Sequence, residues 1–174
     1  NGGTVRNCAF RGSVCGKNAV GGIVGLNQAS GELAYYTVSG SVSGQNAAGG
    51  TAGRNLGQIL KCENHASVNT ATPEEDAGVD PRSVELPLET VPEGEESGLL
   101  NSHSDTGGIA GFSSGVIQSS TNLGTIGYPH VGYNVGGVAG RQTGYMEGCV
   151  NEGTVHGRKD VGGIVGQAEP YIVL

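Results

Sequence analysis

The sequence is poor in the residues that usually build a globular core. Its 174 residues include no tryptophan, two phenylalanines and one methionine, so a core built around large aromatic side chains is not expected. It has no apolar run long enough to cross a bilayer, which argues against direct insertion into a membrane. Basic residues are also few, nine against sixteen acidic ones, and without a basic stripe no binding of nucleic acid is predicted.

Motifs that carry chemistry are also missing. The four cysteines form no C-x-x-C pair, and no histidine stands at zinc-ligand spacing from them. The four histidines match no catalytic spacing, and there is no G-x-S-x-G elbow or phosphate-binding loop. We therefore predict no catalytic residue, no metal site and no cofactor.

What the sequence has in abundance is glycine, 34 residues in all, and much of it lies in one recurring hexad. The hexad first appears as Val-Gly-Gly-Ile-Val-Gly at 20–25, and its copies stand at 48–53, 106–111, 135–140 and 161–166. Self-similarity at a period of about 20 to 50 residues is typical of chains that stack one small unit on the next. The sequence therefore predicts five repeats, with an insertion in the third.

Each period contains three short runs of β-branched residues bounded by glycine, asparagine or serine, a pattern that favours strands over helices. Three strands per period with equivalent residues in register predict an all-β fold. The predicted architecture is a parallel β-helix, or β-solenoid, right-handed, with about five rungs of three short strands each. We interpret 1–174 as a single β-solenoid segment of a longer protein, with 167–174 as a cap or the start of the next module.

Positions that stay apolar in every repeat predict the inward columns. The first column is Val5, Leu33, Ile59, Ile117 and Met146; the second is Val14, Val42, Val68, Ile126 and Val155; the third is Ile23, Thr51, Ile109, Val138 and Ile164. A fourth small apolar column directly follows the third: Val24, Ala52, Ala110, Ala139 and Val165. In a flat strand these residues would face the opposite side. Either a bend at the glycines turns both columns inward, or the small residues simply lie on the surface, or the fourth column is a lateral packing surface for a neighbouring domain or a second copy.

Two polar columns are also predicted. Asn64, Asn122 and Asn151 occupy one column in successive repeats, and stacked amides at a corner can hydrogen-bond along the stack. We interpret them as a structural ladder. Cys8, Cys62 and Cys149 share another column with other residues between them, at separations beyond the reach of a disulfide, which predicts free thiols.

The insertion at 71–105 holds ten of the sixteen acidic residues and one of the nine basic ones, and it is rich in proline. Because repeat proteins often place insertions on the binding face, this loop is the candidate partner-binding segment. Its candidate residues are the carboxylates Glu74, Glu75, Asp76, Asp80, Glu93, Glu95 and Glu96. A solvated loop, contact with a basic protein surface and a bound cation are the alternatives, although no calcium-loop motif is present.

The unit G-x-I-x-x-C-x-N-x-G-x-V-x-G, followed by V-G-G-I-V-G, resembles the GLUG-type repeat of bacterial surface proteins. That repeat also occurs in the non-catalytic N-terminal part of immunoglobulin A-specific metallopeptidases. The resemblance covers almost the whole chain except the insertion. It implies a β-solenoid with a structural or adhesive role, located outside the cell or in the cell wall of a bacterium. The zinc motif of those peptidases is absent, so their activity is not carried over.

The sequence thus predicts a non-enzymatic structural or adhesive repeat module that presents loops to a partner. Expected partners are a host or cell-surface protein, a glycan, and flanking domains of the same chain. One alternative is a carbohydrate-binding or carbohydrate-acting β-helix, similar to a polysaccharide lyase or hydrolase, and another is an accessory region of an immunoglobulin A-specific metallopeptidase. The lyase or hydrolase alternative requires charged residues in matching columns, whereas Arg11, Glu152 and Lys159 are scattered.

Overall fold

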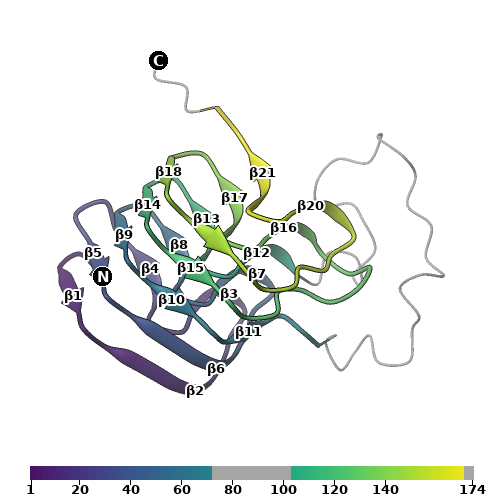
Figure 1. The fold of residues 1–174 in the computed structure, drawn as a ribbon, viewed down its shortest axis with the longest axis horizontal. Helices are drawn as coiled ribbons and strands as arrows, with labels where there is room; N and C mark the ends of the chain where they lie inside the picture. Colours follow the sequence, from purple (N-terminus) through teal and green to yellow (C-terminus); the bar gives the residue numbers. More distant parts are fainter. Residues whose placement is uncertain (72–102, 171–174) are drawn as a thin grey trace.

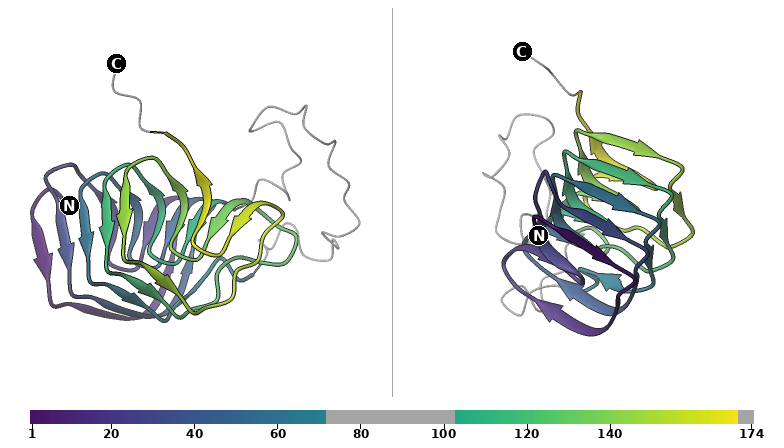
Figure 2. Two further views of the ribbon diagram at one scale, coloured as in Figure 1. Left: turned by 45° about the horizontal axis from the view of Figure 1, so that its top comes forward. Right: turned by 90° about the vertical axis from the view of Figure 1, so that its left-hand side faces the viewer.

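Short parallel strands, stacked turn on turn, make up the whole described fold (Figure 1). The structure is a computed structural model that describes residues 1–71 and 103–170. The strands form a β-solenoid of about five turns, which confirms the predicted all-β fold class. Figure 2 shows the turns following one another along the solenoid axis, from the N-terminal to the C-terminal turn. No helix that could span a membrane occurs within these residues.

Four sheets run along the solenoid, and each takes about one strand from every turn. Sheet A contains β1 (Thr4–Arg6), β5 (Glu32–Ala34), β9 (Gln58–Leu60), β14 (Val116–Gln118) and β18 (Tyr145–Glu147). Sheet B contains β2 (Ala9–Cys15), β6 (Thr37–Ser43), β10 (Glu63–Asn64), β11 (Ser67–Val68), β15 (Thr121–Asn122) and β19 (Val150–Asn151). We number the turns 1 (β1–β4), 2 (β5–β8), 3 (β9–β13), 4 (β14–β17) and 5 (β18–β21).

The other two sheets come from the two halves of the Gly-Gly hexad. Sheet C contains β3 (Asn18–Gly21), β7 (Asn46–Gly49), β12 (Ser104–Gly107), β16 (Tyr133–Gly136) and β20 (Lys159–Gly162). Sheet D contains β4 (Val24–Asn27), β8 (Ala52–Asn55), β13 (Ala110–Ser113), β17 (Ala139–Gln142) and β21 (Val165–Ala168). Each turn therefore has four strand positions rather than the predicted three, because the hexad bends in its middle.

The bend in the hexad explains the two adjacent apolar columns. Ile109 and Ala110 are consecutive, yet both are fully buried and belong to the same core cluster. Consecutive residues of a flat strand face opposite sides, so the chain must turn between sheets C and D for both to point inward. Both alternatives that place the fourth column on the surface are wrong, because Ala52, Ala110 and Ala139 have no exposed area.

The strand register matches the predicted first and second columns. In sheet A, Leu33 pairs with Val5 on one side and with Ile59 on the other. In sheet B, Val42 pairs with Val14 and Val68, and isolated bridges continue that column through Ile126 to Val155. Burying one such side chain contributes about 1.5 to 3 kcal/mol, so these columns are a main source of stability.

The interior is divided into two apolar clusters. One cluster contains the first and third columns, including Leu33, Ile59 and Ile109. The other contains the second column together with sheet C residues such as Val20 and Val135. The two clusters are separated by the second glycine of each hexad on one side of the interior and by the asparagines of sheet B on the other side. A β-carbon on Gly108 would overlap Asn122, so the two walls meet at a waist between the clusters.

The insertion lies between a strand of sheet B and a strand of sheet C. β11 precedes it and β12 follows it. Ser104 and Asp105, which the sequence assigns to the insertion, lie in β12 and continue the stack of sheet C. In the same way, positions 167 and 168, assigned to a cap, lie in β21 and pair with β17.

Candidate functional site

The predicted site residues fall into two groups with different outcomes. The acidic candidates Glu74, Glu75, Asp76, Asp80, Glu93, Glu95 and Glu96 lie outside the described residues. The asparagine column is inside them, at the waist of the solenoid. Among residues 1–71 and 103–170, no three His, Cys, Asp or Glu side chains converge where a metal ion could bind.

Asn64, Asn122 and Asn151 form a hydrogen-bonded ladder. The Nδ2 of Asn64 donates to Oδ1 of Asn122 at 2.8 Å, and the Nδ2 of Asn122 donates to Oδ1 of Asn151 at 2.8 Å. Each amide also binds the backbone two residues ahead; Asn122, for example, donates to Gly124 O and accepts from Gly124 N. Asn64 and Asn122 are fully buried, so the ladder satisfies polar groups that have no access to water.

A second internal ladder at the end of the sheet D strands was not predicted. Asn27 donates through Nδ2 to Oδ1 of Asn55 at 2.9 Å, and Asn55 donates to the hydroxyl of Ser113 at 3.1 Å. All three side chains are fully buried. The signal was in the sequence, because the position five residues after the second glycine of the hexad is polar in the first four repeats.

The cysteine column is free of disulfides, as predicted. Cys62 lies in the first apolar cluster, and burial raises the pKa of its thiol to about 11. Tyr36, its neighbour in turn 2, is equally buried, and burial raises the pKa of its phenol well above the usual 10. Cys62 is therefore an inert core residue rather than a reactive thiol. Cys8 is exposed and Cys149 is half-buried, so the column is not buried along its whole length.

A cation and aromatic cluster on sheet D links three successive turns. Phe112 pairs with Arg54 on one side and Arg141 on the other, and each guanidinium carbon lies 4.9 Å from the ring centroid. Arg141 also reaches Asp105 at 3.1 Å and Glu169 at 3.9 Å. These contacts tie turns 2, 3 and 4 together on the outside of the solenoid.

His103 is the most perturbed base in the described part of the chain. It precedes β12, is 4% exposed and has no hydrogen-bond partner for Nδ1. Burial lowers its pKa from 6.5 to about 4, because a charged imidazolium is disfavoured away from water. The folded protein therefore holds this histidine neutral at pH values where the unfolded chain protonates it.

Stability should consequently fall on acidification. As the pH falls below 6.5, His103 becomes protonated in the unfolded state but stays neutral in the folded state until the pH approaches 4. The free energy of unfolding therefore decreases between these two pH values. Between pH 7.5 and 5 we expect His103 to account for a loss of about 2 kcal/mol. Urea titrations of wild-type protein and His103→Gln at several pH values measure it. A variant with the same pH slope as wild type would contradict this assignment.

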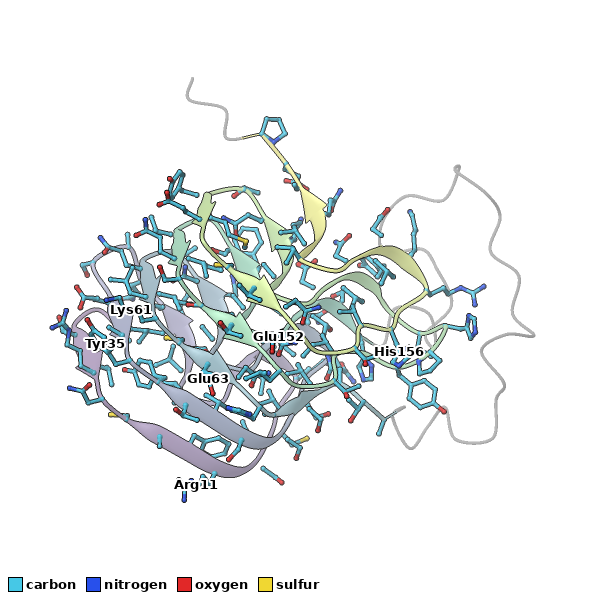
Figure 3. All side chains as sticks on the ribbon, in the orientation of Figure 1. Arg11, Tyr35, Lys61, Glu63, Glu152 and His156 are labelled. Carbon is cyan, nitrogen blue, oxygen red and sulfur yellow. The ribbon has the colours of Figure 1, made fainter. Side chains whose placement is uncertain are left out.

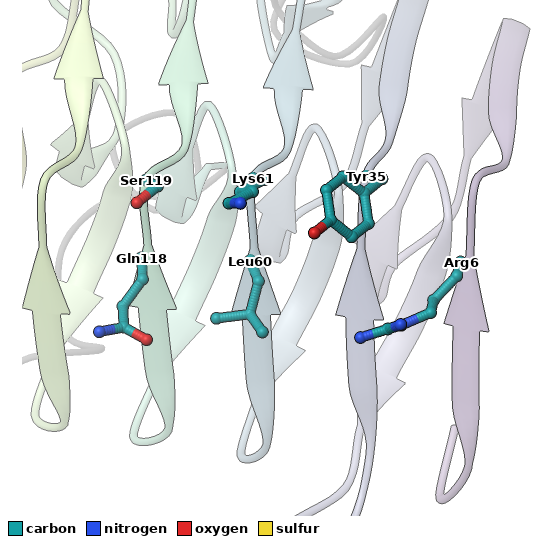
Figure 4. Close-up of a pocket in the computed structure, with 6 residues that line it drawn as sticks. All are labelled: Arg6, Tyr35, Leu60, Lys61, Gln118 and Ser119. Carbon is teal, nitrogen blue, oxygen red and sulfur yellow. The ribbon is translucent and has the colours of Figure 1, made fainter.

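The outer surface of turns 1 to 4 carries a groove beside sheet A, with a volume of about 320 Å³ (Figure 4). It lies along the ends of the sheet A strands and the corner that follows them. Its lining residues are Arg6, Tyr35, Leu60, Lys61, Gln118 and Ser119. A volume of this size lies at the lower end of the range of small-ligand sites, about 300 to 1,000 Å³.

Tyr35 stands in the middle of the groove with a cation on each side. The guanidinium carbon of Arg6 in turn 1 lies 5.8 Å from the ring centroid, and Nζ of Lys61 in turn 3 lies 5.4 Å from it. The tyrosine is 47% exposed, and Figure 4 shows one face of its ring turned toward the viewer, with Arg6 on one side and Lys61 on the other. Figure 3 places Tyr35 and Lys61 at the same end of the molecule, whereas Arg11, Glu152 and His156 lie apart from them and from one another.

The two cations of the groove differ in their partners. Arg6 forms an ion pair with Glu32 at 2.8 Å. Lys61 contacts the Tyr35 ring but no carboxylate within the part of the chain that the structure describes. Gln118 is held by Glu147, which accepts a hydrogen bond from its Nε2 at 3.0 Å. The groove therefore offers an aromatic face, an ammonium group that has no acidic partner among the described residues, and polar atoms of Gln118 and Ser119.

Comparison with known proteins gives no relative: no family model, curated protein or solved structure matches the chain.

Proposed function

We propose that the chain is a non-enzymatic structural and adhesive module of a secreted or cell-wall-associated bacterial protein. Its stacked turns form a stiff scaffold that presents an outer surface to a host or cell-surface partner. The resemblance of its repeat unit to the GLUG type supports the exported setting. The protein or glycan that it contacts would be held without chemical change.

The observation that carries this proposal is the use of buried polar side chains. The amides of Asn27, Asn55, Asn64 and Asn122 bind one another, the backbone and their neighbours along the stack. A fully satisfied internal network of this kind stiffens a fold and fixes its register. The buried polar side chains thus hold the turns together, and recognition is left to the outer surface.

The charged residues of the outer faces support binding over catalysis. Arg11 lies in β2, Glu152 follows β19, and Lys159 begins β20. They belong to different sheets or to turns at opposite ends of the solenoid, and Figure 3 shows Arg11 and Glu152 well separated. Paired acid and base groups for glycan cleavage need much closer placement.

Deletion of 72–102 tests where recognition occurs. β11 and β12 each pair with strands of other turns, so a short Gly-Ser linker in place of the insertion should leave the solenoid folded. We expect the deleted form to keep its binding on a glycan array, because the groove beside sheet A is built entirely from described residues. Binding lost with the deletion would assign recognition to the acidic insertion, and absence of binding by either form would exclude a glycan partner.

A further inference from the structure

We propose that the groove beside sheet A binds an acidic oligosaccharide, with a sugar ring stacked on Tyr35 and a carboxylate paired with Lys61. This inference rests on the proposed adhesive function and names the ligand class of one surface. It is carried by three observations: an exposed aromatic face, a lysine without an acidic partner in the described residues, and a backbone conformation that a tyrosine adopts at a cost.

The backbone of Tyr35 argues that its side chain has a role beyond folding. Its φ is 62°, in the left-handed region, where a β-carbon is strained. The fold requires this conformation at the same corner of every turn, where Asn7, Lys61, Ser119 and Gly148 also have positive φ. Glycine or asparagine is the least costly residue there, and the half-exposed ring of Tyr35 gains little burial in return.

The surroundings of the ring favour a carboxylated sugar. An exposed aromatic ring flanked by polar groups suits the apolar face of a pyranose, while Lys61 supplies a positive charge and Gln118 and Ser119 supply hydrogen-bonding atoms for hydroxyl groups. Arg6 is already paired with Glu32, so Lys61 is the principal partner for an anion. An extended acidic peptide would need separate pockets for alternate side chains, whereas this groove offers one aromatic face beside one ammonium group.

The direction of the groove favours a linear polymer. Its residues come from turns 1, 2, 3 and 4 in succession: Arg6, Tyr35, Lys61 and Ser119. Neighbouring turns are about 4.8 Å apart, a spacing close to the repeat of sugar rings along an extended polysaccharide. A chain lying along the solenoid axis would therefore pass successive turns with successive sugars.

Isothermal titration calorimetry of the full chain tests the proposal. The probes are oligomers of galacturonate, mannuronate and hyaluronan, a neutral galactose oligomer, and a poly-glutamate peptide. We expect at least one uronate oligomer to bind, the neutral oligomer to bind about tenfold more weakly or not at all, and added salt to weaken the uronate affinity. Tyr35→Asn and Lys61→Ala should each weaken that affinity about tenfold.

Two control variants distinguish a specific loss of binding in the groove from a general effect of removing a surface tyrosine or lysine. Tyr145→Ala removes another exposed tyrosine of sheet A, which lies beside Glu147 rather than beside a lysine. Lys159→Ala removes the same charge from β20, away from the groove. Both should bind as wild type does. Tyr35→Asn should retain or raise the melting temperature, because asparagine tolerates positive φ better than tyrosine does, so its loss of binding cannot be attributed to unfolding.

Three results would overturn the proposal: no uronate oligomer binds, poly-glutamate binds as tightly as the uronates, or Tyr35→Asn and Lys61→Ala bind as wild type does. If those two variants still attach to the glycans that wild type recognises on an array, the groove is excluded while the adhesive function stands. If wild type attaches to no partner at all, the proposed function itself fails.

Discussion

Replacing Gly108 by alanine should destabilise the protein by about 3 kcal/mol and lower its melting temperature by roughly 6 to 12 °C. Gly108 is the second glycine of the hexad in turn 3, at the waist between the two apolar clusters. A β-carbon there would overlap the carbonyl oxygen of Gly137 in the next turn and the amide of Asn122. The carbonyl of Gly137 is backbone and the Asn122 amide belongs to the buried ladder, so moving either of them would disrupt hydrogen bonds between turns.

The last turn provides a matched control for this substitution. Gly163 occupies the same position of the hexad, yet a β-carbon on it would meet no atom within 4 Å. Gly163→Ala should therefore change the melting temperature little, and calorimetry of both variants measures the contrast. Equal losses of stability would show that the glycine is required by its own backbone conformation rather than by close approach of the turns.

Asn122→Ala should cost about 3 kcal/mol, because it removes the middle member of the waist ladder. The substitution deletes the bonds to Asn151 and Gly124 and removes the acceptor of the Asn64 amide. It leaves buried backbone and side-chain groups without partners, and an unpaired buried polar group costs more than its hydrogen bond contributes. Urea unfolding followed by circular dichroism measures the change.

Asn46 is the matched control for Asn122. It also bridges neighbouring turns, donating to Asn18 at 2.7 Å and accepting from Ser104 at 2.8 Å. Its side chain is exposed, so water replaces the lost partners. We expect Asn46→Ala to cost less than about 1 kcal/mol. A loss as large as that of Asn122→Ala would contradict the claim that burial gives the internal ladder its importance.

The repeat pattern of the sequence was sufficient to predict the stack and its inward columns. Equivalent positions recur at a nearly fixed interval, and identical side chains in successive turns must meet when parallel strands pair in register. The fourth strand of each turn was not predicted, although the adjacent apolar residues Ile109 and Ala110 already indicated a bend between them. The apolar pattern pointed to the bend but not to the separate strand that follows it, because the two strands that flank it are each only four residues long.

The candidate groove was harder to predict than the ladder for a related reason. Asn64, Asn122 and Asn151 repeat one residue type at one position, whereas Arg6, Tyr35 and Lys61 are different residues from different turns. Arg6 precedes the corner at which Tyr35 and Lys61 stand in the next two turns. The positively charged and aromatic groups meet only because stacking places them together. Repetition in the sequence identifies the residues that build the solenoid. It gives no indication of groove residues such as Tyr35, which occur in one turn only.

Calorimetry followed by mass spectrometry of the ligand distinguishes binding from turnover. The full chain is titrated with a uronate oligomer in the calorimeter, and the chain length of the recovered oligomer is then determined by mass spectrometry. We expect saturable binding, weakened about tenfold in Tyr35→Asn, and an oligomer of unchanged length. Recovery of shortened oligomers from wild type would show that the solenoid cleaves its ligand and would contradict a non-enzymatic function.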